Sequence, residues 1–287
     1  MRRSRRELLT AFASLTATAA ASKACAASDE YRFGLTPVFL TSDQELLSRL
    51  RAYLERKLDR RVRLVSRRTY QEITALLLSG QVDAAWICGY PYVVSRAHLA
   101  LVSVPVWQQR PLYRSYLICE RNRTASSLED LGGDVHAFSD PDSNSGWLVT
   151  AAALAREGKT PDRFFAQSIF TYGHRNVIRA VGAGLAQSGS VDGYVYEVMR
   201  DLEPDLIGAT RIVERSAQLG FPPIACTAAA AASPLTLRLQ TALRQMPDDE
   251  DGQSVLTMLR LDGFSLQQSS LYDTIAEEVS VVRGLNR

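Results

Sequence analysis

The chain alternates short apolar segments with longer segments of helical periodicity, and this alternation constrains its fold more than any other feature. Between residues 43 and 58, leucines recur mostly three or four positions apart, which indicates an amphipathic helix. Thr69 and Glu72 have the spacing of a capping box at the start of a second helix, which Gly80 would end. The apolar run 83–88 that follows is typical of a buried strand. Repeated along the chain, this pattern predicts an α/β fold.

The alternating segments form two groups, and extended apolar stretches at 113–119 and 221–227 lie between them. We therefore predict two α/β domains, or lobes, joined by a two-strand hinge, with a small ligand bound in the cleft between them. Residues 27–115 and 226–287 would form the first lobe and residues 116–225 the second. A chain of 287 residues is long enough for two such domains.

Residues 1–26 have the pattern of a cleaved export signal. Four arginines precede a weakly apolar stretch that is too short for a membrane span, and an A-x-A cleavage site ends at Ala26. The segment Ser4–Leu9 resembles the twin-arginine signal, which would mean export in the folded state. An ordinary secretion signal and a lipoprotein anchored at Cys25 are the alternatives. We predict a periplasmic protein whose signal peptide is cleaved near Ala26.

The charge of the mature chain argues against a nucleic-acid partner. The whole sequence has 33 basic and 31 acidic residues, of which the export signal contains five and one, so 28 and 30 remain. General nucleic-acid binding needs a clustered basic face. We expect none here.

The segment Asp140–Trp147, which reads DPDSNSGW, is the most informative stretch of the chain. It follows a predicted strand and opens a predicted helix, where free backbone N–H groups and the positive end of the helix dipole favour an anion. Ser143, Asn144 and Ser145 add uncharged donors, and Gly146 allows close approach of the backbone. The pattern predicts a site for a tetrahedral oxyanion. The alternative is a simple helix cap, where Ser and Asn are also favoured.

Four residues elsewhere are candidates for the same cleft. Tyr90 lies in a predicted loop after a strand, where it would offer a ring and a hydroxyl group. His174 and Arg175 stand at the start of a predicted helix, and both side chains can interact with an anion. Asp192 lies at the start of a predicted strand, 191–195. For each residue, a local structural role is the alternative.

An enzyme is the competing functional class. Ser145, His174 and Asp192 can be interpreted as a hydrolase triad, but the G-x-S-x-G motif needs glycine at position 143, where this chain has Ser143. No histidine has a second His or Cys at metal-ligand spacing, so we expect neither a metal nor a cofactor. The sequence therefore favours a binding protein without catalytic activity.

Three cysteines remain after the export signal, and each ends an apolar run. This position is typical of buried thiols. Since an oxidising compartment permits one disulfide, we predict that Cys119 and Cys226 approach each other on adjacent crossing strands.

Four features, in this order, resemble the phosphate/phosphite/phosphonate-binding proteins of ABC transporters, which have the type 2 periplasmic-binding-protein fold. They are the segment 83–92, the stretch 116–119 followed by 127–133, the serine loop 140–146, and Gly173-His174 followed by Val191-Asp192. The resemblance covers essentially the whole mature chain. It implies a monomer that delivers a small anion to an ABC permease in the inner membrane. A membrane sensor, which would need the same binding cleft, is the alternative.

The resemblance also implies roles for the candidate residues. Ser143, Asn144 and Ser145 would hold the phosphonate oxygens, and His174 would donate to the same group. Tyr90 would line the cleft from the first lobe, and Asp192 would face the other end of the ligand.

Two positions depart from the family pattern. Asn144 stands where threonine is common, and Arg175 replaces the carboxylate of aminophosphonate-binding relatives. A cation at position 175 would disfavour an ammonium group, so we expect a ligand other than 2-aminoethylphosphonate.

Overall fold

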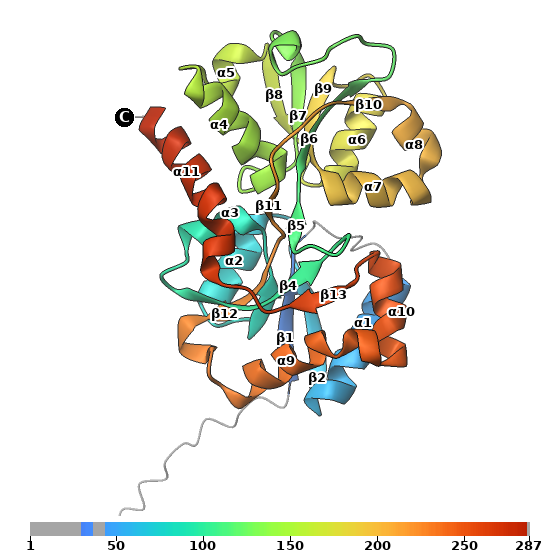
Figure 1. Ribbon diagram of the computed structural model, residues 1–287, viewed down its shortest axis with the longest axis vertical. Coiled ribbons are helices and arrows are strands. Elements are labelled where there is room, and N and C mark those ends of the chain that lie inside the picture. The colour runs from blue at the N-terminus through green and yellow to red at the C-terminus, as the bar shows by residue number, and fades with distance from the viewer. Residues whose placement is uncertain (1–29, 37–43, 286–287) are drawn as a thin grey trace, which may run out of the picture.

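The structure is a computed structural model that describes residues 30–36 and 44–285. The predicted export signal lies outside these residues. Two β-sheets, each flanked by helices, lie one above the other and are connected by extended segments (Figure 1). The α/β prediction is confirmed, and we call each sheet with its helices a lobe.

The first lobe contains a six-stranded sheet whose neighbouring strands are partly parallel and partly antiparallel. In spatial order its strands are β13 (Gly263–Ser265), β4 (Leu99–Val106), β12 (Ile224–Thr227), β3 (Ala84–Trp86), β1 (Glu30–Leu35) and β2 (Arg61–Ser66). Its helices are α1 (Gln44–Leu58), α2 (Tyr70–Leu78), α3 (Gly89–Val94), α9 (Pro234–Arg244) and α10 (Glu250–Leu259). β1 is parallel to both β2 and β3, as expected for strands joined through helices.

The second lobe contains a five-stranded sheet. In spatial order its strands are β10 (Thr210–Arg215), β6 (Ser115–Glu120), β9 (Ser188–Asp192), β7 (Val135–Phe138) and β8 (Gln167–Phe170). Its helices are α4 (Val149–Arg156), α5 (Pro161–Phe164), α6 (His174–Gly182), α7 (Gly193–Leu202) and α8 (Pro204–Gly208). β7 is parallel to β8 and β9, so the carboxyl ends of these three strands share one edge of the sheet.

Two segments carry the chain between the lobes. β5 (Leu112–Tyr113) pairs antiparallel with β11 (Leu219–Gly220), and this short ribbon lies between the two sheets (Figure 1). The C-terminal helix α11 (Asp273–Leu285) adds another connection, because it packs on α3 of the first lobe and α4 of the second. That the ribbon acts as a hinge stays a prediction, as does the division at residues 115 and 226.

Local sequence signals explain several element boundaries. The predicted capping box is present at α2: the Glu72 N–H donates to Thr69 Oγ1 at 3.2 Å, and the Thr69 N–H donates to Glu72 Oε2 at 3.0 Å. Gly80 follows the helix with a φ of 69°, a conformation that glycine adopts without strain. The predicted loop at Tyr90 is wrong, since Gly89–Val94 forms α3. Pro91 is compatible with this helix because it lies in the first turn, where no N–H is needed.

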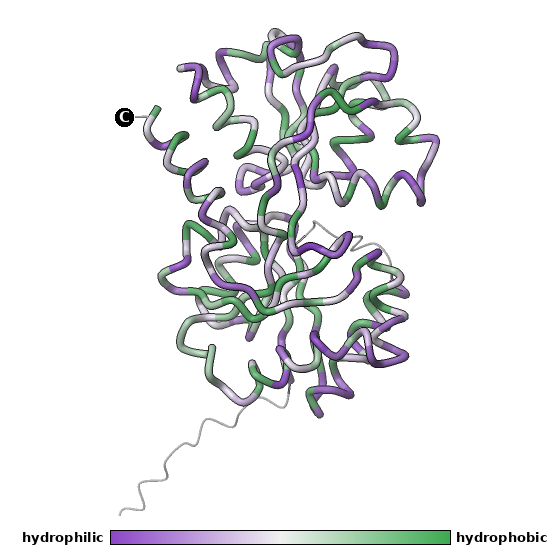
Figure 2. The backbone as a smooth tube through the Cα atoms, viewed as in Figure 1, coloured by the Kyte–Doolittle hydropathy of each residue, from purple (hydrophilic) through white to green (hydrophobic). Residues whose placement is uncertain are grey.

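Within the part of the chain that the structure describes, the buried apolar side chains form two clusters. The larger runs through both lobes and contains Phe33 and Trp86 in the first lobe and Ile118 and Val177 in the second. The smaller cluster lies entirely in the second lobe, around Phe138. Figure 2 shows that hydrophobic stretches follow the central strands, whereas hydrophilic residues gather on the outer helices. Burial of each large apolar side chain stabilises the fold by about 1.5–3 kcal/mol.

The predicted approach of Cys119 and Cys226 is wrong. Cys119 pairs with Ser188 and Arg211 within the five-stranded sheet, while Cys226 pairs with Ala100 in the six-stranded sheet. Both thiols are buried and free, as is the thiol of Cys88. The two cysteines are separated because β5 and β11 run in opposite directions between the lobes. After β5 the chain enters the second lobe, where Cys119 lies, and after β11 it returns to the first lobe, where Cys226 lies.

Candidate functional site

The serine loop, residues 140–146, connects β7 to α4 at the carboxyl edge of the second sheet. Its conformation is fixed locally: the Asp142 N–H donates to Asp140 Oδ1 at 2.8 Å, and the Gly146 N–H donates to Ser143 Oγ at 3.0 Å. A π-helical turn, Asn144–Leu148, then leads into α4. The loop therefore presents the first turn of a helix toward the first lobe.

Gly146 is required by close packing inside this loop. A Cβ atom at this position would lie 1.9 Å from Ser139 Oγ and 2.9 Å from Ser143 Oγ. No side chain fits at such distances, so the tight turn depends on glycine. Ser139 Oγ is itself buried without a hydrogen-bond partner among the described residues.

The three polar residues before Gly146 are buried where the lobes meet. Ser143, Asn144 and Ser145 are each at most 1% exposed. The Asn144 N–H donates to Cys88 Sγ of the first lobe at 3.2 Å, and Asn144 Nδ2 donates to the hydroxyl of Tyr113 at 2.9 Å. Asn144 Oδ1 has no partner within the described part of the chain. The loop is thus in direct contact with the first lobe.

His174, the first residue of α6, lies beside Tyr70 of the first lobe and Asp192 of the second. Its Nε2 lies 3.2 Å from the hydroxyl of Tyr70, and its Nδ1 accepts the backbone N–H of Asp192 at 3.0 Å. A backbone N–H can only donate, so Nδ1 is unprotonated and Nε2 carries the proton. Burial lowers the pKa of His174 to about 3, which keeps the ring neutral. His174 is therefore an uncharged donor.

Asp192 ends β9 and caps α7, which begins at Gly193. The predicted strand 191–195 is therefore wrong in its second half. Asp192 Oδ1 accepts the N–H of Val195 at 3.2 Å. Desolvation by burial raises the pKa of this carboxyl group to about 7.

The geometry does not match a hydrolase triad. In a triad the His Nδ1–H donates to the acid, whereas His174 Nδ1 accepts a backbone N–H from Asp192. The carboxylate of Asp192 instead caps α7.

Three residues of the site were not predicted from the sequence: Tyr70, Cys88 and Tyr113. The Tyr70 N–H donates to Asp140 Oδ2 at 3.3 Å, in addition to the contact between its hydroxyl and His174. The capping box places Tyr70 at the first position of α2, and this was the only local signal for it. Together with the loop residues, His174 and Asp192, they form what we call the buried polar cluster. Its members are Tyr70, Cys88, Tyr113, Asp140, Ser143, Asn144, Ser145, His174 and Asp192.

The cluster collects helix N-termini from both lobes. Tyr70 begins α2, Asn144 begins the turn into α4, His174 begins α6, and Asp192 caps α7. Each N-terminus carries about half a positive charge together with free N–H groups. Within residues 30–36 and 44–285, no Lys or Arg side chain is hydrogen-bonded to the cluster residues. The arrangement suits an anion held by neutral donors.

Two predicted site residues are directed elsewhere. The ring of Tyr90 stacks on Trp147, with centroids 6.1 Å apart, so it packs beside the serine loop. Arg175 forms an ion pair with Glu203 at the end of α7. The structure therefore brings His174, Asp192 and the serine loop together, whereas the ring of Tyr90 packs on Trp147 and the guanidinium group of Arg175 pairs with Glu203.

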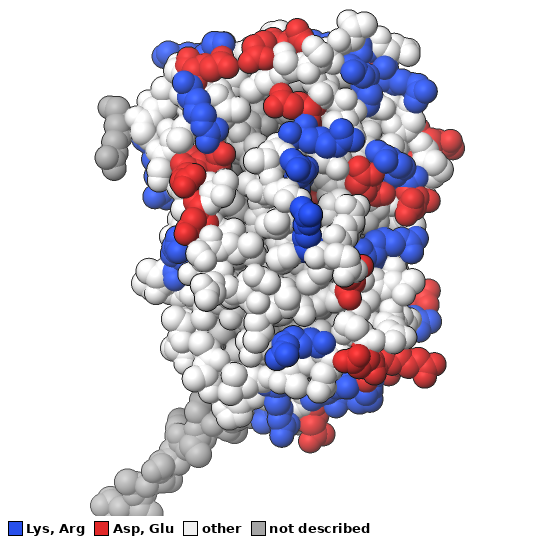
Figure 3. Space-filling model, viewed as in Figure 1, with Lys and Arg blue, Asp and Glu red and all other residues white. Residues whose placement is uncertain are grey.

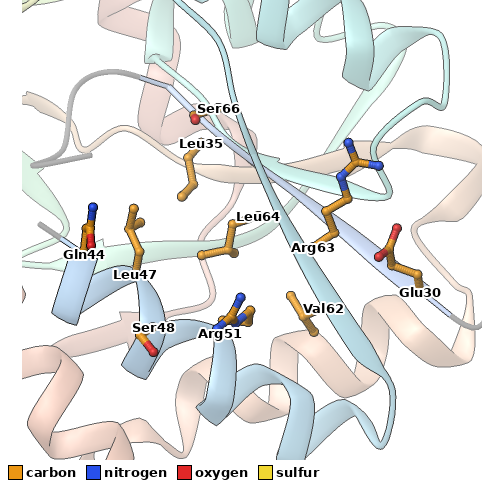
Figure 4. A pocket seen from close by; sticks show the side chains of 10 residues that line it. All are labelled: Glu30, Leu35, Gln44, Leu47, Ser48, Arg51, Val62, Arg63, Leu64 and Ser66. Carbon is orange, nitrogen blue, oxygen red and sulfur yellow. The ribbon is translucent and has the colours of Figure 1, made fainter. Parts of the chain in front are cut away.

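A separate hollow of about 430 Å³ lies between α1 and β2, at the outer edge of the first sheet (Figure 4). Its lining includes the apolar side chains of Leu47 and Leu64 and the guanidinium groups of Arg51 and Arg63. None of the cluster residues lines this hollow. It is therefore distinct from the candidate site.

Metal-binding groups and membrane-spanning helices are both absent from residues 30–36 and 44–285. No group of three His, Cys, Asp or Glu residues there is arranged to hold a metal ion. No described helix has the length and apolar character needed to cross a membrane.

Known proteins share both the family pattern and the fold of this chain. Residues 33–272 match the family model described as the periplasmic substrate-binding protein of phosphonate ABC transporters. A binding-protein component of a phosphonate ABC transporter from Pseudomonas aeruginosa has a TM-score of 0.81 at 18% identity, over 90% of this chain and 87% of that one. PhnD1 from Prochlorococcus marinus, in complex with methylphosphonate, has a TM-score of 0.78 at 17% identity, over 90% and 98%. A Xanthomonas citri protein bound to ATP has a TM-score of 0.71 at 19% identity, over 90% and 98%. These likenesses establish a shared fold.

Proposed function

The chain belongs to the periplasmic substrate-binding proteins of phosphonate ABC transporters, and from this premise we propose that its buried polar cluster binds a small phosphonate, phosphite or phosphate-like anion. Membership of this family favours transport over the sensory alternative, with an ABC permease as the partner. The family consists of binding proteins, not enzymes. We further propose that the chain acts as a monomer and that residues 1–26 direct its export, by the twin-arginine route.

One observation carries the ligand proposal: helix N-termini from both lobes meet at neutral donors, and no Lys or Arg side chain of the described residues is hydrogen-bonded to them. An oxyanion is stabilised by several N–H and O–H donors, and each hydrogen bond to a charged group contributes about 1.5–3 kcal/mol. Without a Lys or Arg partner, the anion remains exchangeable. Such a site suits a protein that must release its ligand.

We propose that the lobes separate to admit the ligand and then close over it, because their contact already buries the cluster. In the present arrangement the Asn144 N–H is taken by Cys88 Sγ, and the Tyr70 N–H by Asp140. A thiol sulfur is a weak acceptor, so an anionic oxygen that replaced it would gain free energy. The ligand would then bind one lobe and shift the population toward the closed state.

The structure changes one expectation about specificity. The charge of Arg175 was the reason to disfavour 2-aminoethylphosphonate, and this side chain is paired with Glu203, which also lies 3.8 Å from Arg179. Asp192, buried beside His174, would be available to an ammonium group. That ligand therefore belongs in the first screen.

A thermal-shift screen of the mature protein tests the proposal. The panel is phosphate, phosphite, methylphosphonate, 2-aminoethylphosphonate, sulfate, taurine and ATP. A ligand present at a hundredfold above its dissociation constant should add about 2.7 kcal/mol of stability. We expect a shift with at least one phosphorus anion and none with taurine. No shift with any phosphorus compound would contradict the proposed ligand class.

Replacing Ser145 by alanine should weaken binding of the anion that shifts the melting temperature most. The lost hydrogen bond to a charged group predicts a cost of roughly 1–3 kcal/mol, measured by titration calorimetry. Ser143→Ala should weaken binding similarly, and it should also lower stability because Ser143 Oγ caps the turn. Ser280→Ala, on an exposed face of α11, is the matched control. Wild-type affinity in both loop variants would exclude the serine loop as the binding site.

A further inference from the structure

A second polar hollow lies beside the strands that cross between the lobes. It encloses about 520 Å³ and is lined from the first lobe by Trp107, Gln108 and Arg110, and from the second by Glu197. Arg114 and Arg215 line it from the crossing segments themselves. Figure 3 shows Lys and Arg side chains over these segments, in the middle of the face that it displays. The hollow therefore touches both lobes and the connection between them.

Three guanidinium groups in this hollow have no carboxylate partner. Arg110, Arg114 and Arg215 form no ion pair with any residue of the described ranges 30–36 and 44–285. The hollow's one carboxylate, Glu197, is paired with Arg200 at 2.8 Å and accepts the hydroxyl of Tyr116 at 3.1 Å. The hollow thus has an excess of positive charge.

Neutral contacts hold these guanidinium groups in place. Arg114 donates to the carbonyl of Ser216, and Arg110 Nη1 lies 3.4 Å from Gln218 Oε1. Arg215 lies over the ring of Tyr116, 5.0 Å from its centroid. Groups already held in position lose less conformational entropy when they bind a ligand.

The rim of the hollow contains an unusual turn. Trp107 and Arg110 are joined by a two-residue turn in which Gln108 and Gln109 have φ values of 51° and 63°. Asn-Gly is the usual choice for such a turn, and side chains at positive φ carry strain. Asp262 compensates by accepting the Gln109 N–H at 2.7 Å. The strained turn places the side chains of Gln108 and Arg110 in the lining of the hollow.

We propose that this hollow is a second ligand site, for a small polyanion with two or more carboxylate or phosphate groups. Arginine pairs with such groups through two parallel hydrogen bonds, and a singly charged ligand would leave two of the three guanidinium groups unpaired. The volume lies within the range of small-molecule sites. Tyr113 lines this hollow and also belongs to the buried polar cluster, but the proposal does not depend on which ligand the cluster binds.

The test uses citrate and inorganic pyrophosphate as probes, titrated into the mature protein in a buffer without other multivalent anions. We expect one binding site per chain for at least one probe. Arg110→Gln with Arg215→Gln should weaken that binding at least about tenfold, since two charge-assisted pairs are lost. Arg244→Gln, an exposed arginine at the end of α9, should leave it unchanged.

A substitution in the buried polar cluster distinguishes probe binding in this hollow from probe binding in the cluster. Ser145→Ala should leave probe affinity unchanged, because Ser145 does not line the hollow. The single variant Arg215→Gln serves if the double variant fails to fold, and circular dichroism checks folding. Absence of binding by both probes at millimolar concentration would overturn the proposal. So would binding that is lost in Ser145→Ala but kept in the arginine variants.

Discussion

Replacing Asn144 by aspartate is expected to abolish binding of the phosphorus anion. The two side chains have nearly the same shape, but the new carboxylate would repel the ligand. At an effective dielectric constant of 20, two charges about 4 Å apart repel by about 4 kcal/mol, which corresponds to roughly a thousandfold loss of affinity. Titration calorimetry of both proteins with the anion selected by the screen measures this loss.

The substitution keeps the shape of the side chain, and circular dichroism checks that the buried carboxylate leaves the fold intact. Asn144 Nδ2 now donates to the Tyr113 hydroxyl, which can rotate and donate to a carboxylate instead. Asn176→Asp is the matched control, because Asn176 is exposed on α6 of the same lobe. An affinity for Asn144→Asp that stays within about fivefold of wild type would show that the anion binds elsewhere.

Asp192→Asn is expected to remove a large pH dependence of stability. The folded-state pKa of Asp192 is raised to about 7, above the value of about 3.9 for an unfolded chain. The protonated carboxyl group therefore makes its full contribution to the free energy of unfolding below about pH 4, and this contribution is lost as the pH rises through about 7. The difference between a pKa of about 7 and one of about 3.9 corresponds to roughly 4 kcal/mol of unfolding free energy. Wild type should lose unfolding free energy from pH 5 to pH 8, and the variant should lose much less.

Denaturant unfolding at pH 5 and pH 8 measures this difference. Asparagine is as good a helix cap as aspartate, so the α7 cap at Val195 should be kept. Asp249→Asn is the control, since Asp249 caps α10 but has a pKa lowered by Arg56 and Lys57. The ionised Asp249 side chain stabilises the fold at every pH above its unfolded-state pKa, and this stabilisation is lost only at lower pH. The Asp249→Asn variant should therefore be less stable than wild type by the same amount at pH 5 and at pH 8. Parallel pH profiles for wild type and Asp192→Asn would contradict the account.

Local sequence patterns predicted those features that depend on neighbouring residues. The capping box of α2 and the alternation that gives two α/β lobes follow from short-range hydrogen bonds and periodicity. The serine loop was identified because its donors and Gly146 are adjacent in the sequence. Such features need no knowledge of the tertiary arrangement.

Features that depend on distant segments were missed. Tyr70 meets Asp140 and His174 only because the lobes face each other, and no local pattern reports this. Similarly, Arg175 was considered a ligand contact because Glu203, its partner, lies outside the motif. The disulfide prediction was wrong for a related reason, since adjacent crossing strands run in opposite directions and separate Cys119 from Cys226.

A crystal structure of the mature protein with the anion selected by the thermal-shift screen tests the central claim most directly. The account predicts a tetrahedral anion within hydrogen-bond distance of the serine loop and of His174 Nε2. It also predicts that the Asn144 N–H donates to the anion in place of Cys88 Sγ. An anion bound outside the buried polar cluster, with the contacts between Asn144 and Cys88 and between His174 and Tyr70 unchanged, would contradict it.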